Sequence, residues 1–315
     1  MRRRSFFRKQ IRMNDLKRFL QDFWRERPLS GAVLYFVAVS ALFFGVGRLL
    51  PQSIGTEIIF RLILSVLILI FLYAIYDWTP KALGFSAKGI GTSIRLSWSE
   101  WLKIVVYLAL LLMLANPEAL NQLLQSGTSA GYAPMMRGVA QNLSALTPQK
   151  LIATILFGVS VGLFEETFFR VGLVAQLRVR FADSCRGAWC TVLIGAGLFA
   201  ALHMMNAFGQ SLTVTAMQVI QAFGTGVLWG AVYWRSGNAV IPVILHSLTD
   251  ILIVLATAGT AASVAPGFSS SVALMAFDVG LAAIYLRPQK TRYSGIQTRS
   301  LWYNDQIGNG ANLLK

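Results

Sequence analysis

Apolar residues gather in eight long runs that are separated by polar or basic connections, the longest of which, about 117–149, is expected to be a loop. Each run is close to the roughly 20 residues that one helical crossing of a bilayer requires. The runs lie at about 30–50, 57–77, 101–116, 150–177, 188–207, 211–234, 239–258 and 267–286. The pattern predicts an all-α, polytopic integral membrane protein with about eight transmembrane helices.

We expect one transmembrane domain, over residues 29–287, because no internal repeat, nucleotide-binding glycine loop or Gly/Ser linker divides the chain. Residues 1–28 form a basic arm, and residues 288–315 form a polar C-terminal tail. Apolar residues in the arm follow helical spacing: Leu16, Phe19, Leu20, Phe23 and Trp24. An amphipathic helix of this kind is expected to lie along the inner leaflet of the membrane.

The net charge of +15 needs an explanation, because only 13% of the residues are charged. In a soluble protein such a charge would favour nucleic-acid binding. Here ten of the 28 Lys and Arg residues precede residue 28, and most others fall in alternate connections. This distribution is typical of membrane proteins, in which most Lys and Arg residues lie in the cytosolic connections and contact the anionic inner leaflet. We therefore expect both termini in the cytosol and no nucleic-acid partner.

The cellular compartment follows from weaker signals. The first apolar run is longer than the 7–15-residue apolar region of a signal peptide, so we expect it to be retained. The alternative is that the N-terminal segment is an organellar transit sequence. Cys185 and Cys190 lie near a predicted cytosolic turn, where thiols stay reduced, and their spacing is not that of a zinc site. We expect a bacterial plasma membrane, or the endoplasmic reticulum membrane in a eukaryote.

Ionisable residues that are candidates for chemistry lie in three of the apolar runs, although charged residues such as Arg61 and Asp278 occur in other runs. One run carries Glu165, Glu166 and Arg170, another carries His203, and a third carries His246 and Asp250. A charged side chain in mid-membrane costs roughly 2.5–3.5 kcal/mol on insertion scales, so such residues usually face the protein interior and have a function. Interhelical hydrogen bonding is the structural alternative for either histidine.

The spacing of these residues predicts how they face one another. Glu166 and Arg170 are four residues apart and can pair on one helix face, whereas Glu165 points about 100° away and stays free. His246 and Asp250 are also four apart and can line one cavity. Phe199 lies one turn before His203 and can form a wall of the site.

Glu165 and His203 are each nineteen residues from Ser184, which lies in the polar turn between two runs. An antiparallel hairpin that turns there places both residues at one depth. A second polar turn, before the run that carries His246, lies on the same side of the membrane. His246 lies about 13 Å along the helix from that turn, at 1.5 Å per residue. We therefore expect a catalytic cavity that faces the cytosol.

A carboxylate with two histidines favours the activation of a water molecule, and two mechanisms fit. Glu165 can act as a metal-free general base, which is the mechanism that we favour. Alternatively, Glu165, His203 and His246 can bind zinc as a His₂Glu set. A proton-coupled transporter also uses buried acids and histidines, but the inverted repeats typical of transporters are not evident.

Three motifs occur in order on separate runs: Glu165-Glu166-Thr167-Phe168-Phe169-Arg170, Phe199 to His203, and His246 to Asp250. The chain thereby resembles the CPBP family of intramembrane proteases, which is related to the CAAX prenyl endopeptidases. Each motif alone is weak, but the three together are specific. The resemblance spans residues 150–258, which we interpret as the protease core.

The resemblance implies an eight-helix endopeptidase that acts on a membrane-associated polypeptide. By this resemblance Glu165 and His203 activate water, and His246 with Asp250 stabilises the oxyanion. Asp250 departs from the Asn of some members, and a carboxylate cannot donate to an oxyanion unless it is protonated, so Asp250 is expected to orient His246. Some relatives in the family are thought to bind and regulate other membrane proteins without catalysis, and this is the alternative function.

Overall fold

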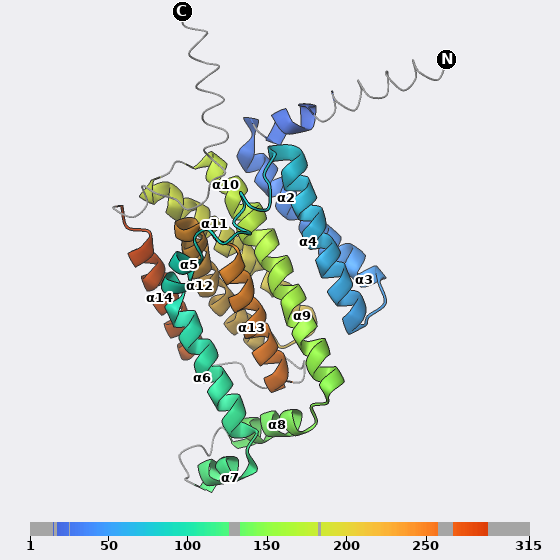
Figure 1. The fold of residues 1–315 in the computed structure, drawn as a ribbon, viewed down its shortest axis with the longest axis vertical. Helices are drawn as coiled ribbons and strands as arrows, with labels where there is room; N and C mark the ends of the chain where they lie inside the picture. Colours follow the sequence, from blue (N-terminus) through green and yellow to red (C-terminus); the bar gives the residue numbers. More distant parts are fainter. Residues whose placement is uncertain are drawn as a thin grey trace, which may run out of the picture.

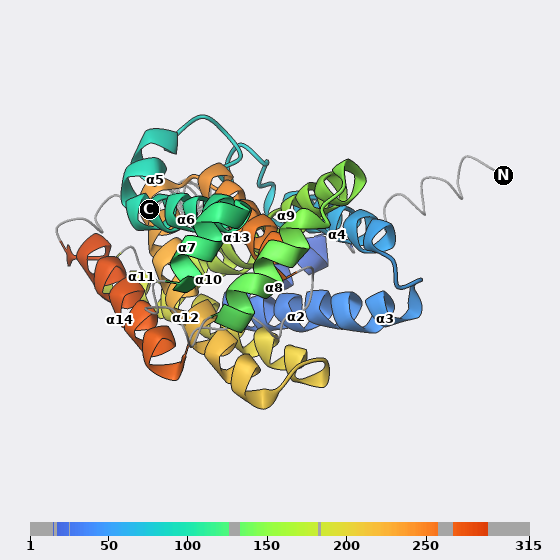
Figure 2. The ribbon, with the colours of Figure 1, turned by 90° about the horizontal axis from the view of Figure 1, so that it is seen from below.

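The computed structural model describes residue 15 and residues 18–24, 26–125, 133–181, 184–257 and 267–288. Within these ranges all regular structure is helical, and the helices form an elongated bundle (Figures 1 and 2). The elements are α2 (Pro28–Ala41), η1 (Leu42–Val46), α3 (Gly47–Leu49), α4 (Ile54–Tyr76), α5 (Ile90–Leu96), α6 (Trp98–Leu114), α7 (Pro117–Gln125), α8 (Ala133–Ser144), α9 (Pro148–Glu166), η3 (Thr167–Val174), α10 (Ala175–Arg180), α11 (Cys185–His203), η4 (Met204–Phe208), α12 (Leu212–Ser236), α13 (Val240–Thr257) and α14 (Phe268–Tyr285).

Seven helices of the described residues are long and apolar enough to cross a membrane, and α5 with α6 makes an eighth span if that pair is counted as one. The predicted number and positions of the crossings are therefore confirmed. The third crossing differs from the expected plain run at 101–116, because α5 and α6 meet at a bend of 67°. The connection after it also contains two helices, α7 and α8, where the sequence indicated a loop.

Short polar residues begin the long helices at the ends of the apolar runs. The Ser53 hydroxyl accepts a hydrogen bond from the Thr56 amide at the start of α4, and Ser184 and Ser211 cap α11 and α12 in the same way. Each cap satisfies one of the amide groups that a helix leaves free at its first turn. These serines therefore fix where each crossing begins.

The turn between α12 and α13 is held by the connection between α4 and α5. Gly237 ends α12 in a left-handed conformation with φ of 63°. The Asn238 side-chain amide donates to the carbonyl oxygens of Ser86 and Lys88, at 2.9 and 3.0 Å. This packing anchors the start of α13, six residues before His246.

Helices α9 and α13 approach closely along their length. A Cβ atom at Gly158 would overlap the side chain of Ile251, and one at Gly162 would overlap Ser247. Only glycine permits this separation, so the two positions bring the carboxylates of α9 next to the polar residues of α13.

The two ends of the bundle differ in charge. The helices alternate in direction, so the connection from α4 to α5 lies at the same end as α10, whereas α7 and α8 lie at the other end (Figure 1). Lys81, Lys88, Arg178 and Arg180 belong to the first end. This distribution agrees with the alternation seen in the sequence, and the cytosolic orientation of that end stays a prediction.

Part of the N-terminal arm is described. Trp24 is buried, and Gln21 donates a hydrogen bond to the Ala74 carbonyl oxygen at 2.9 Å. Phe19 is 66% exposed. The last turns of the arm therefore pack on α4, and Phe19 points outward from them. Leu16, residues 1–14 and the tail from 289 onward lie outside the described residues.

Candidate active site

Helices α9 and α13 bring the predicted polar residues together inside the bundle. Glu165 and Glu166 end α9, and His246 and Asp250 lie one turn apart on α13. The close packing at Gly158 and Gly162 lies one to two turns before these carboxylates. The site is thus held by two helices whose backbones are nearly in contact.

His246 is the centre of this group of residues. Its Nδ1 lies 2.8 Å from Glu166 Oε1, and its Nε2 lies 3.4 Å from Glu165 Oε2 and 3.5 Å from Asp250 Oδ2. The Glu166 side chain is fully buried, whereas those of Glu165 and Asp250 are each 23% exposed. The two carboxylates that face Nε2 are therefore the accessible ones.

The predicted pair of Glu166 and Arg170 is confirmed. Arg170 Nη1 lies 3.0 Å from Glu166 Oε1, and both side chains are buried. The guanidinium also lies over the rings of Phe199 and Trp229, at 4.6 and 5.4 Å from their centroids. Burial of this cation is compensated by one carboxylate and two aromatic faces.

Glu166 has a second contact that the sequence did not predict. The sequence predicts that Asp250 orients His246, because a carboxylate cannot donate to an oxyanion unless it is protonated. Asp250 lies 3.5 Å from Nε2, and this role stays a prediction, whereas the closer contact, at Nδ1, is the hydrogen bond to Glu166. Glu166 bridges Arg170 and His246, which no spacing within one helix could reveal.

His203 lies at the edge of the group. Its Nδ1 is 2.9 Å from the Phe199 carbonyl oxygen, and its ring packs edge-on against the Phe199 ring at 4.8 Å. The Phe199 ring is also 6.1 Å from the His246 ring. Within the described ranges no hydrogen bond or ion pair joins His203 to Glu165. The Phe199 ring therefore contacts both histidine rings, and its predicted role as a wall of the site stays a prediction.

Trp229 on α12 is a further residue of the site. Its ring centroid lies 5.0 Å from that of His246, and it also contacts Arg170. Sequence reasoning missed it because tryptophans in membrane proteins usually mark the interfaces. Its place within a crossing, away from either end of α12, was the only available signal.

The electrostatics of the site are unbalanced. Three carboxylates, Glu165, Glu166 and Asp250, surround one guanidinium and one imidazole. Like charges this close in a buried site repel each other, and one guanidinium and one imidazole do not offset all three carboxylates.

In the part of the chain that the structure describes, no three His, Cys, Asp or Glu side chains are arranged to hold a metal ion. The alternative zinc set requires Glu165, His203 and His246 to converge on one point, and among the described residues no hydrogen bond or ion pair joins His203 to either of the other two. The metal-free and the zinc mechanisms both stay predictions.

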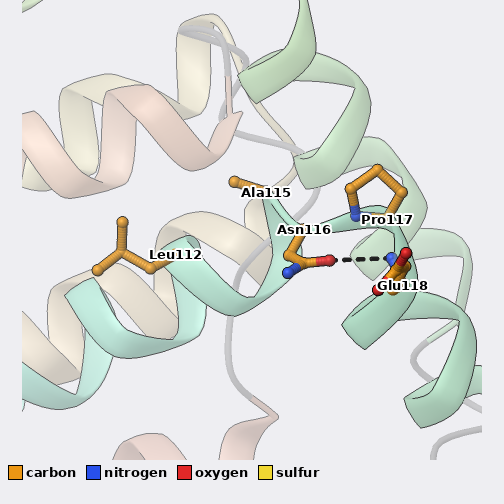
Figure 3. A pocket seen from close by; sticks show the side chains of 5 residues that line it. All are labelled: Leu112, Ala115, Asn116, Pro117 and Glu118. Carbon is orange, nitrogen blue, oxygen red and sulfur yellow. Dashed lines mark hydrogen bonds between the residues drawn. The ribbon is translucent and has the colours of Figure 1, made fainter.

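An open hollow lies at the corner between α6 and α7. It is lined by Leu112, Ala115, Asn116, Pro117 and Glu118 (Figure 3). The Asn116 side-chain oxygen accepts from the Glu118 amide at 3.0 Å and thereby caps α7. None of the predicted catalytic residues lines this hollow.

Comparison with known families gives one match. Residues 147–252 match the family described as type II CAAX prenyl endopeptidase Rce1-like. Comparisons with curated proteins and with solved structures gave no match. The matched segment covers about a third of the chain and runs from α9 into α13, so it contains every residue predicted for the site. Across this segment the chain is similar to the Rce1-like family, which agrees with the resemblance to CPBP-type membrane proteases.

Proposed function

We propose that this protein is an intramembrane endopeptidase that hydrolyses a peptide bond of a membrane-associated polypeptide with water activated by Glu165. The observation that carries the proposal is the meeting of Glu165, His246 and Asp250 inside the bundle, within the Rce1-like segment. We further propose that the site is reached from the cytosol, at the basic end of the bundle.

Glu165 is the general base of the proposed reaction. Glu166 already bonds Arg170 and His246, whereas the contact of Glu165 with His246 is longer, at 3.4 Å, and Glu165 is partly accessible. Its carboxylate takes one proton from a water molecule, and the water oxygen attacks the carbonyl carbon of the scissile bond. The proton then passes to the leaving nitrogen as the C–N bond breaks.

His203 supports the same water molecule. A carbonyl oxygen only accepts hydrogen bonds, so the Nδ1 atom that bonds Phe199 carries the proton. Neutral His203 then keeps its Nε2 as an acceptor. A water molecule that donates one hydrogen to Glu165 and the other to His203 has its lone pair directed at the substrate.

His246 stabilises the developing oxyanion. Its Nδ1 proton is held by the Glu166 carboxylate, so Nε2 can donate only when the ring is an imidazolium ion. Glu166 and Asp250 lie on the two sides of the ring and favour that ion. The positive charge of the His246 ring is therefore already in position when the negative oxyanion forms.

No metal is part of this mechanism, and the metal requirement can be tested directly. We expect cleavage to continue at an undiminished rate after treatment with a strong zinc chelator. Loss of cleavage with chelator, and its return with one zinc ion per chain, would replace the glutamate mechanism by the zinc mechanism.

The test of the proposed function compares new protein termini in membranes of cells that express wild type, Glu165→Gln or Glu57→Gln at equal abundance. Glu57 is a matched control, because it is also a span glutamate with an arginine four residues later, at 2.9 Å from Arg61. We expect wild type and Glu57→Gln to share termini that Glu165→Gln lacks. Identical termini in all three would favour the non-catalytic regulator.

The same termini decide the substrate class. The family description names CAAX prenyl proteins as substrates of the family. New C-termini at prenylated cysteines would assign that class to this chain, whereas new termini within leader peptides or other membrane proteins would assign another polypeptide class.

A further inference from the structure

The helix that carries Glu165 and Glu166 changes its winding directly after them. Residues Thr167–Val174 form a π-helix, η3, and all eight of these residues are buried. A π-helix is rare and frequently lies at a functional site, and its wider turn shifts the hydrogen-bond ladder by one residue. Two carbonyl groups of this segment also accept hydrogen bonds from side chains.

One of these carbonyl groups is bonded from α2. The Tyr35 hydroxyl donates to the Phe168 carbonyl oxygen at 3.0 Å, and Tyr35 is 3% exposed. A Cβ atom at position 172 would overlap this hydroxyl, so Gly172 makes the approach possible. The Tyr35 ring also packs edge-on against Phe168 at 5.6 Å.

A second carbonyl group is bonded through a relay from α4. The Gln176 side-chain amide donates to the Gly172 carbonyl oxygen at 3.1 Å, and the Tyr76 hydroxyl donates to the Gln176 side-chain oxygen at 3.1 Å. Gln176 and Tyr76 are both buried. Two tyrosines from the N-terminal helices thus reach the same π-helical segment.

We propose that Tyr35, and the relay of Tyr76 and Gln176, are positioning residues that hold η3 in its π-helical winding. The inference rests on the proposed function of Glu165. If η3 returned to α-helical winding, residues on its two sides would rotate relative to each other by about 100°, the angle of one residue. Glu165 and Glu166 lie on one side of η3 and the packing of α10 on the other.

Both tyrosines lie outside residues 147–252, the segment that matches the family. The inference therefore gives the first two crossings a part in catalysis. They set the geometry of the carboxylates without touching the substrate or the reacting atoms.

The experiment compares Tyr35→Phe with Tyr233→Phe. Tyr233 is a matched control, because its buried hydroxyl also donates to a carbonyl oxygen at 3.0 Å, that of Leu83, away from η3. On a substrate found by the comparison of termini, we expect Tyr35→Phe to lower kcat about tenfold with KM within about twofold. Tyr233→Phe should leave both constants within about twofold of wild type, and Tyr76→Phe should lower kcat to a smaller extent than Tyr35→Phe.

Hydrogen exchange of the purified full chain gives a readout that needs no activity. We expect backbone amides of residues 167–174 to exchange about tenfold faster in Tyr35→Phe than in wild type or Tyr233→Phe. Equal exchange and equal kcat in Tyr35→Phe and Tyr233→Phe would overturn the inference. If wild type produced no termini, the proposed function would fail, and the exchange comparison alone would decide whether Tyr35 holds the segment.

Discussion

Two groups of buried charges flank α12, and they are built differently. The lysine cluster consists of Glu100, Lys103 and Asp278. The histidine cluster consists of Glu165, Glu166, Arg170, His246 and Asp250. The first meets α12 at Thr225, whose hydroxyl lies 3.5 Å from Asp278, and the second meets it one turn later at Trp229.

In the lysine cluster the cation contacts both acids directly. Lys103 Nζ lies 2.8 Å from Glu100 Oε1 and 3.1 Å from Asp278 Oδ1. The side chains of the two acids are 6% and 3% exposed. This arrangement joins α6 to α14 and presents little that a substrate could reach, so we interpret it as structural.

In both clusters the acids outnumber the cations, but in the histidine cluster only Glu166 is closely paired. Glu165 and Asp250 have the His246 ring at 3.4 and 3.5 Å and are partly accessible. The comparison teaches that burial of charge alone does not mark a reactive site. Incomplete pairing together with access is what distinguishes the proposed site from the lysine cluster.

The largest effect is expected when the centre of the histidine cluster is replaced. We expect His246→Gln to lower the cleavage rate by about 100-fold or more, because the oxyanion loses its donor. Thermal unfolding in detergent should change little, since glutamine still bonds Glu166. An unchanged cleavage rate would show that His246 takes no part in the reaction.

Replacement of the centre of the lysine cluster should have the opposite outcome. Lys103→Met leaves two buried acids without a cation, and we expect the free energy of unfolding to fall by about 3 kcal/mol. Cleavage per folded molecule should stay within about twofold. Further replacement of the acids by Glu100→Gln and Asp278→Asn should restore stability, as measured by denaturant unfolding.

A smaller effect is expected from Arg170→Lys. Lysine keeps the charge beside Glu166 but loses the planar contacts with Phe199 and Trp229. We expect a loss of roughly 1 kcal/mol in stability and a several-fold loss in cleavage rate. Equal rates for Arg170→Lys and wild type would mean that charge alone is required.

The smallest effect is expected from Asp250→Asn. The amide keeps the shape of the residue next to His246 and can itself donate to an oxyanion. The resemblance also places Asn at this position in some members of the family. We expect the cleavage rate to change by less than tenfold in initial-rate assays, and a 100-fold loss would assign Asp250 an essential proton.

Sequence reasoning located the helices well because each crossing must satisfy its own backbone within one apolar run. It also paired Glu166 with Arg170, since contacts four residues apart depend only on the helix. It did not find the bend between α5 and α6, or the helices α7 and α8, because loop composition does not determine how such segments pack.

The sequence by itself determined the number of crossings, the charge asymmetry of their ends and the motifs that identify the family segment. Tertiary structure alone decided that His246 bonds Glu166, that Trp229 joins the site and that Tyr35 reaches the Phe168 carbonyl oxygen. These contacts join helices that are far apart in the chain. Their existence depends on the rotation and separation of packed helices, which periodicity along one helix does not specify.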